Sequence, residues 1–150
     1  DIEEIYDVRI LLESYAIKNS VKTLTSKNIQ ELMETLQLLV KYYEKNDLTH
    51  YIEVDTQLHQ YIINLGGNSL IVDTYRRIYS QSQQFRIYSL TTQRRFDDSV
   101  TEHRSIVENI CSGNWKEADR VNKIHLALAR EEIIQHFESK KAVEEEQENE

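Results

Sequence analysis

The chain contains no proline and only three glycines in its 150 residues. The glycines occupy just two places, Gly66–Gly67 and Gly113. Proline and glycine interrupt regular secondary structure more strongly than other residues, so a chain that almost lacks them can form long helices joined by a few short connections. The sequence therefore predicts an all-α fold. Its length suits one domain with a single hydrophobic core.

Apolar residues recur with helical spacing in six segments. The glycines at 66–67 and 113 provide end signals for the third and fifth segments. Three segments follow residues that favour helix N-caps: Thr25 or Ser26, Asp47 or Thr49, and Asn68 or Ser69. The predicted helices cover about residues 1–22, 26–45, 48–66, 69–88, 97–111 and 114–140.

The net charge of −8 is unevenly distributed. Residues 144–150 hold five glutamates and no basic residue, which leaves −3 for the rest of the chain. We expect residues 141–150 to form an acidic tail that is either a solvated helix end or disordered. No clustered basic face is present, which argues against nucleic-acid binding by this chain alone.

Other classes of protein are also disfavoured. No apolar run is long enough for a membrane span or a signal peptide. The single cysteine, Cys111, has no partner for an internal disulfide, and we expect it to be inert packing in a cytoplasmic protein. The chain begins with Asp1 and has its only methionine at Met33, so we expect a fragment of a longer product.

Four polar residues occupy positions where the helical pattern predicts apolar ones. A carboxylate and three imidazoles buried without partners would cost several kcal/mol each, on the order of the transfer penalties for polar groups. Each histidine taken singly could be a hydrogen-bonded core residue. Taken together, they indicate a divalent metal site. The four residues and the stripes that they interrupt are Asp55 and His59 (Leu48, Ile52, Ile62), His103 (Val100, Val107, Ile110) and His125 (Ala118, Val121, Leu128).

Nitrogen and oxygen ligands of this kind suit several divalent ions. Zinc is the first choice, and nickel, manganese, iron or cobalt would also fit. The other two histidines, His50 and His136, lie off these stripes, and we expect both at the surface.

Arg9 interrupts the inward stripe predicted for the first helix, Ile2, Ile5, Leu12 and Ala16. Its guanidinium either pairs locally with Glu13, one turn later, or faces the metal cavity and binds a carboxylate ligand. The polar middle of the fourth helix, with Arg86 one turn beyond Ser82, poses a similar choice. It forms either a solvated or subunit-contact face or a wall of the cavity.

The common enzyme signatures are missing. The chain has no HExxH, no Glu-x-x-His pair, no His-Asp dipeptide and no glycine-rich phosphate loop. An alternative remains: a metal-dependent hydrolase or lyase on a helical-bundle scaffold. Glu102 is its only candidate general base, and its position next to His103 points it to a different helix face. We therefore predict no catalytic residues and no enzyme.

The ordered set of motifs resembles the FCD effector domain of FadR-subfamily GntR transcription regulators. The resemblance covers residues 1 to about 137, and it suggests the VanR-like branch with six helices. The residues that carry it are Asp7-Val-Arg9-x-x-x-Glu13, Tyr51-Ile-Glu-Val-Asp55-Thr-Gln-Leu-His59-Gln, Gly67-Asn68-Ser69-Leu70, Arg95-x-x-x-Ser99-x-x-Glu102-His103-x-x-Ile106, Gly113-Asn114-x-x-x-Ala118 and His125.

The resemblance implies an antiparallel six-helix bundle over residues 1–140 that encloses a metal and ligand cavity. Its metal ligands would be Asp55, His59, His103 and His125. A small organic acid would bind through its carboxylate to the open positions of the metal, helped by Arg9. If the polar middle of the fourth helix is a wall of the cavity, we expect Arg86 and Ser82 to contact the acid as well. Two such domains would pair as a homodimer. A winged helix-turn-helix domain, absent from this fragment, would bind operator DNA, and no membrane would be involved.

Overall fold

The computed structural model describes residues 1–150, and all its regular elements are helical. The predicted all-α class and the six α-helices are confirmed. The elements in chain order are α1 (Ile2–Ser20), α2 (Ser26–Glu44), α3 (Leu48–Leu65), α4 (Ser69–Ser82), the 3-10 helix η1 (Gln83–Leu90), α5 (Gln93–Cys111) and α6 (Trp115–Glu148).

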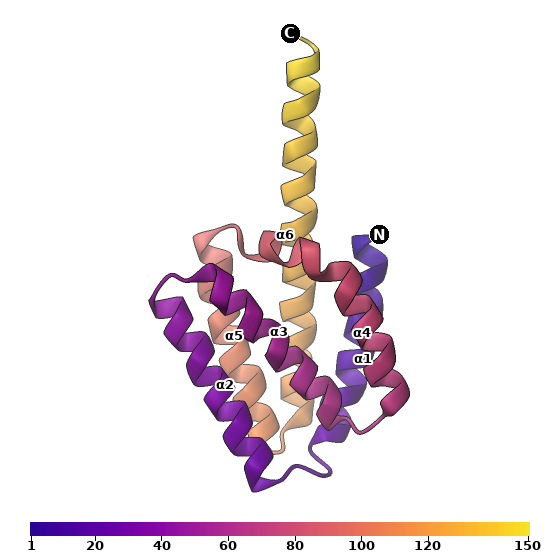
Figure 1. Ribbon diagram of the computed structural model, residues 1–150, viewed down its shortest axis with the longest axis vertical. Helices are drawn as coiled ribbons and strands as arrows, with labels where there is room; N and C mark the ends of the chain where they lie inside the picture. Colours follow the sequence, from indigo (N-terminus) through magenta and orange to yellow (C-terminus); the bar gives the residue numbers. More distant parts are fainter.

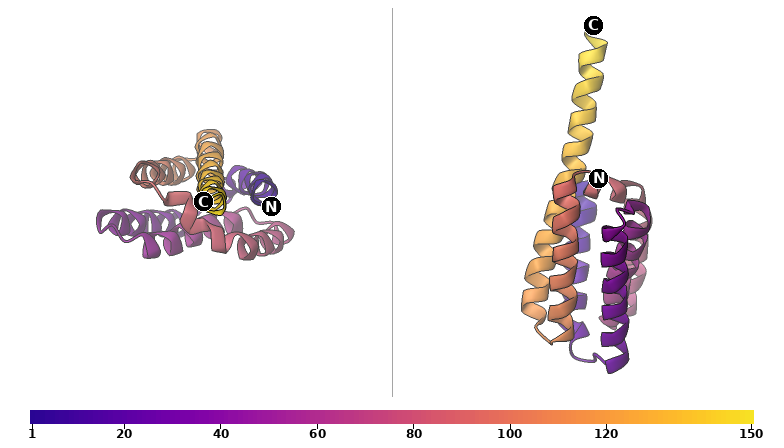
Figure 2. Two further views of the ribbon diagram at one scale, coloured as in Figure 1. Left: turned by 90° about the horizontal axis from the view of Figure 1, so that it is seen from above. Right: turned by 90° about the vertical axis from the view of Figure 1, so that its left-hand side faces the viewer.

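The helices form an antiparallel bundle of two layers, with consecutive α-helices running in opposite directions (Figure 1). Figure 2 shows α2, α3 and α4 in one layer and α5, α6 and α1 in the other. Between α4 and α5, η1 crosses the end of the bundle at which the N-terminus lies (Figure 1). This crossing places η1 over the space between the layers.

Local sequence signals set most helix ends. Thr25 makes a capping box with Asn28, Asp47 accepts a hydrogen bond from the backbone of His50, and Asn68 caps the start of α4. Gly67 and Gly113 have φ angles of 73° and 80°, which other residues rarely adopt. The predicted caps and glycine end signals therefore correspond to real helix ends.

Three predicted boundaries were wrong. The fourth α-helix ends at Ser82 rather than near Tyr88, because the chain there tightens into η1 and turns across the bundle. Helix α5 begins at Gln93, four residues early, because Thr92 caps it. Helix α6 continues to Glu148, and every residue from 138 onward is exposed. Of the two expectations for the acidic tail, the structure has the solvated helix end.

Most buried apolar side chains meet between the two layers. The main cluster draws on all six α-helices and on Leu90 of η1. A smaller cluster between α1 and α6 consists of Tyr6, Leu126, Ala129 and Ile133. No helix combines the length and the apolar content that a membrane span requires.

The inward faces of α1 and α6 differ from the predicted stripes. On α1 the buried residues include Tyr6, Glu13 and Ile17 rather than Ile2, Ile5 and Leu12, which are half-buried. On α6, Leu128 is 40% exposed, and the residues buried around His125 are Asn122, Leu126 and Ala129. Both helices contact more than one neighbour, so their buried faces are wider than a single stripe and are rotated from it.

Candidate metal and ligand site

Helices α3, α5 and α6 bring four side chains to one point inside the bundle. Asp55, His59, His103 and His125 each offer one ligand atom, and these atoms all lie within 4.8 Å of one another. The three histidines are buried, and the Asp55 side chain is 17% exposed. The residues singled out by the interrupted stripes thus converge.

The ε nitrogens of two histidines face the same carboxylate oxygen. Oδ1 of Asp55 lies 3.1 Å from Nε2 of His59 and 2.9 Å from Nε2 of His103. The two Nε2 atoms are 3.2 Å apart. The ring of His125 stacks on that of His59 with 5.4 Å between centroids. A carboxylate oxygen and two imidazole nitrogens therefore lie within 3.2 Å of one another at the centre of the cluster.

Each histidine engages a second partner through its other ring nitrogen. Nδ1 of His59 lies 2.5 Å from Oε1 of Glu13. Nδ1 of His103 lies 2.8 Å from the Tyr51 hydroxyl, and Nδ1 of His125 lies 2.7 Å from Oε1 of Glu102. Partners of this kind hold the Nδ1 proton and turn the Nε2 lone pair inward, as they do around metal-bound histidines.

This arrangement fits a cation. Oδ1 of Asp55 is buried and makes no well-oriented hydrogen bond, although two imidazoles lie close to it. A divalent ion would satisfy that oxygen and the inward lone pairs at once. One carboxylate and three imidazoles are a donor set suited to zinc and to the neighbouring first-row metals.

Burial and neighbouring charges shift the pKa values of the cluster. Burial and the nearby His103 lower the pKa of His125 to about 4, which keeps it in the neutral, ligand form at pH 7. Burial alone would raise the pKa of Asp55, but His103 and His59 hold it well below its usual range. For His59, burial lowers the pKa while the Glu13 carboxylate raises it, and the net shift is upward.

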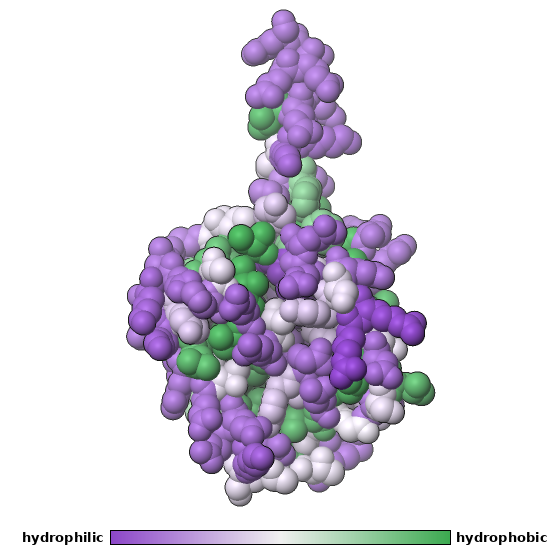
Figure 3. All heavy atoms as spheres, viewed as in Figure 1, coloured by the Kyte–Doolittle hydropathy of each residue, from purple (hydrophilic) through white to green (hydrophobic).

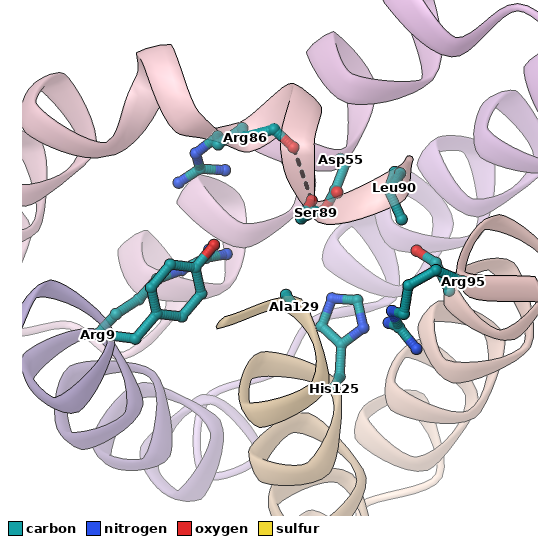
Figure 4. Close-up of a pocket in the computed structure, with 10 residues that line it drawn as sticks. Arg9, Asp55, Arg86, Ser89, Leu90, Arg95, His125 and Ala129 are labelled. Carbon is teal, nitrogen blue, oxygen red and sulfur yellow. Dashed lines mark hydrogen bonds between the residues drawn. The ribbon is translucent and has the colours of Figure 1, made fainter. Parts of the chain in front are cut away.

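A small cavity adjoins the cluster and shares Asp55 and His125 with it. The cavity offers about 10 Å³ to the centre of a water molecule, enough for about one water. Figure 4 shows its wall, in which three arginines approach from different elements. The lining residues are Tyr6, Arg9, Asp55, Arg86, Ser89, Leu90, Arg95, Ser99, His125 and Ala129.

Arg9 makes the local ion pair and also faces the cavity, and its binding of a carboxylate ligand stays a prediction. Its Nε donates to Oε2 of Glu13 at 2.6 Å, which is the local ion pair. The same side chain lines the cavity, and it is 4% exposed. Through Glu13, Arg9 is linked to His59, so the first helix contacts both the cavity and the metal cluster.

The structure separates the other two residues predicted to contact an effector. Arg86 lines the cavity from η1. Ser82 is buried but does not line it, since its hydroxyl donates to the backbone oxygen of Tyr79. The prediction for Ser82 assumed one continuous helix to Tyr88. Because α4 ends at Ser82, the two side chains do not share a helix face.

Several residues of the site were missed or misplaced by sequence reasoning. Arg95 lines the cavity and forms a two-pronged ion pair with Glu102, at 3.0 and 2.6 Å. Glu102 leaves α5 on a different side from His103, as expected, yet it still contacts the cluster through His125 on α6. Neither Tyr51 nor Ser89 was predicted in the site, because neither is a polar residue that interrupts one of the predicted apolar stripes.

The two histidines expected at the surface lie outside the cluster. His50 is exposed, pairs with Asp47 at 2.7 Å and stacks on Tyr42. His136 is half-buried rather than exposed, because its ring stacks on Tyr88 with 4.2 Å between centroids.

Known proteins resemble this chain over most of its length. The uncharacterized HTH-type transcriptional regulator YdhC of Bacillus subtilis strain 168 is 24% identical over 138 residues, which are 91% of this chain and 57% of YdhC. The chain thus corresponds to little more than half of that relative.

Solved structures share the fold. The metal-free FCD domain of TM0439 matches with a TM-score of 0.78 and 24% identity, covering 92% of this chain and 94% of that one. Escherichia coli McbR/YncC matches with a TM-score of 0.81 and 16% identity, covering 90% of this chain and 65% of that one. A family model described as the FCD domain matches residues 4–128, most of the bundle and all four residues of the cluster. The chain therefore belongs to the FCD domain family.

Proposed function

We propose that this chain is the effector-sensing and dimerisation domain of a GntR-family bacterial transcription regulator. Its membership of the FCD family supports this, as does its likeness to YdhC, whose name describes an HTH-type transcriptional regulator. The fold is also that of a Streptococcus agalactiae protein named GntR, with a TM-score of 0.74 at 19% identity. That match covers 87% of this chain and 58% of the GntR chain.

We propose that the domain binds a divalent metal, with zinc as first choice, through Asp55, His59, His103 and His125. One observation carries this proposal: the four ligand atoms lie within 4.8 Å while all three Nδ1 atoms are already engaged elsewhere. The Glu13 carboxylate raises the pKa of His59 and so favours its protonated form. Because a metal binds the neutral imidazole, loading the site would release this proton.

We further propose that a small organic acid binds in the adjoining cavity. The bound metal would supply an open coordination position for a carboxylate. Arg9 and Arg86 supply guanidinium groups at the cavity wall, and the buried setting strengthens their attraction for an anion.

Effector binding would act on operator DNA through a winged helix-turn-helix domain outside this chain. Two copies of the bundle would pair and hold two such domains in the cytoplasm. A coupling free energy of about 1–3 kcal/mol between effector and operator is typical of allosteric proteins.

Glu102, the candidate general base of the enzyme alternative, is already engaged. Both oxygens of Glu102 accept from Arg95, and one also faces His125. The FCD family and YdhC point to a regulator, so we propose a binding domain and no catalytic activity.

Elemental analysis of protein purified without chelators tests the metal site. We expect about one divalent ion per chain in the wild type and in His50→Ala, whose side chain lies outside the cluster. We expect almost none in His103→Ala, which also melts at a lower temperature because it loses the stabilisation by the bound ion. Equal metal content in the two variants would refute the assignment.

A further inference from the structure

Arg86 differs from the other two arginines of the cavity. Arg9 is paired with Glu13, and Arg95 is paired with Glu102. Arg86 is only 5% exposed, yet no carboxylate lies within ion-pair distance of it. A buried guanidinium without a counter-ion is costly and calls for an anionic partner.

The contacts of Arg86 leave much of its hydrogen-bonding capacity free. Nη1 donates to the Thr56 hydroxyl at 3.1 Å, and the guanidinium lies over the ring of Tyr79, 4.7 Å from its centroid. Nε and Nη2 are buried and make no well-oriented hydrogen bond, and the uncharged Tyr75 hydroxyl is the nearby group that also interacts with the guanidinium. These two donors lie side by side on one edge of the planar group, which is a pair that a carboxylate can bind in a two-pronged manner.

The charges around the cavity point to a ligand with two negative groups. Glu13 neutralises Arg9, and Glu102 neutralises Arg95. In a loaded site, Asp55 would balance one of the two charges of a divalent ion. One positive charge then remains at the Asp55–histidine cluster and a second at Arg86. A monocarboxylate would leave one of them uncompensated.

We propose that the cavity selects a small dicarboxylate, with one carboxylate at the Asp55–histidine cluster and the other at Arg86. This inference rests on the proposed function and names its ligand class. Figure 4 shows Arg86 and His125 entering from opposite sides of the cavity, so the two charges belong to separate groups of the ligand rather than to one.

Arg86 sits on the segment that must move to admit such a ligand. The present cavity has room for about one water, so a dicarboxylate requires its wall to shift outward. Arg86, Ser89 and Leu90 all belong to η1, a 3-10 stretch with poorer hydrogen-bond geometry than an α-helix. The second carboxylate therefore binds the same segment that covers the site.

Matched acids of equal chain length test the proposal. Metal-loaded protein is titrated calorimetrically with succinate, butyrate and inorganic phosphate. We expect succinate to bind at least about tenfold more tightly than butyrate, as a charge-assisted hydrogen-bond pair at Arg86 would provide. Phosphate, whose charges share one group, is expected to bind no better than butyrate.

Arg86→Met keeps the length of the side chain and removes its charge. We expect this variant to retain its metal content and to lose much more affinity for succinate than for butyrate, so that the preference for succinate disappears. Without ligand it should melt no lower than the wild type, because an unpaired buried charge is gone. Arg77→Gln, an exposed arginine on α4, serves as the matched control and should keep the preference.

The outcomes separate this inference from the proposed function. Equal affinity of the wild type for succinate and butyrate overturns the dicarboxylate assignment and leaves the carboxylate sensor intact. Equal weakening of both acids in Arg86→Met overturns it as well. If no acid binds metal-loaded protein, the proposed function itself fails and the inference fails with it.

Discussion

Nδ1 of His59 lies 2.5 Å from Oε1 of Glu13, across 46 residues of sequence. Glu13 is fully buried, and its other oxygen accepts from Arg9 and from the Tyr75 hydroxyl. One carboxylate on α1 therefore orients a cluster histidine on α3 and holds an arginine of the cavity wall. The metal cluster and the ligand cavity share this group.

Glu13→Gln should weaken metal binding although it removes no proposed ligand. The amide oxygen can still accept from Nδ1 of His59 but lacks the negative charge that raises its basicity, and changes to such a partner typically cost about 10–100-fold in metal affinity. Competition with a chromophoric chelator measures this affinity. Glu4→Gln, an exposed position on the same helix, should leave it unchanged, and equal affinities in the two variants would contradict the orienting role.

Gly66→Ala should destabilise the bundle more than Gly67→Ala. A Cβ at position 66 would lie 2.8 Å from Cα of Ala16, so α1 and α3 would be pushed apart at a cost of about 1–3 kcal/mol. At position 67 the Cβ meets nothing within 4 Å, and only the positive φ opposes it, at about 1 kcal/mol. Urea unfolding of both variants compares the two costs, and the reverse order would show that the α1–α3 contact tolerates separation.

The stability of the metal-free protein should decrease as the pH is lowered from about 6.5 to 4. His125 has an ordinary pKa of 6.5 and a pKa of about 4 in the folded state. In that window the unfolded chain binds a proton that the folded chain does not, so acid favours unfolding, by up to about 3 kcal/mol at pH 4.

His125→Gln should lack this component of the pH dependence, whereas His50→Gln should keep it. Denaturant unfolding with chelator present, repeated across the pH range, measures the difference. Parallel pH profiles for His125→Gln and the wild type would show that His125 is not held neutral.

Removal of residues 141–150 should leave the bundle intact. Figure 3 shows the projecting part of α6 as almost wholly hydrophilic, and every residue from 138 onward is exposed. We expect the free energy of unfolding to change by less than about 0.5 kcal/mol, the usual range for surface changes. Truncation before Ile133, which is fully buried against α1, should destabilise the protein strongly. A large loss on the shorter truncation would reveal contacts made by the tail.

The elements of this fold follow from local sequence. Capping residues such as Asp47 and Asn68, together with Gly67 and Gly113, act within a few positions, so their effect on helix ends is present in the sequence itself. The four-residue spacing of Asp55 and His59 is equally local, because one helical turn places both on one face. The metal that this spacing predicts stays a prediction, whereas the convergence of the side chains is a feature of the structure.

The sequence did not predict which side chains pair between different helices. Glu13 contacts His59 and Glu102 contacts His125 because of how far each helix is rotated about its axis, and rotation depends on packing against several neighbours at once. The end of α4 at Ser82 has the same origin, since the crossing of η1 places Arg86 in the cavity and leaves Ser82 outside it. Sequence alone determined which segments are helical and that Asp55, His59, His103 and His125 face inward. Tertiary structure decided which buried charges found partners, because helical periodicity acts over one turn and ion pairing depends on distances between helices.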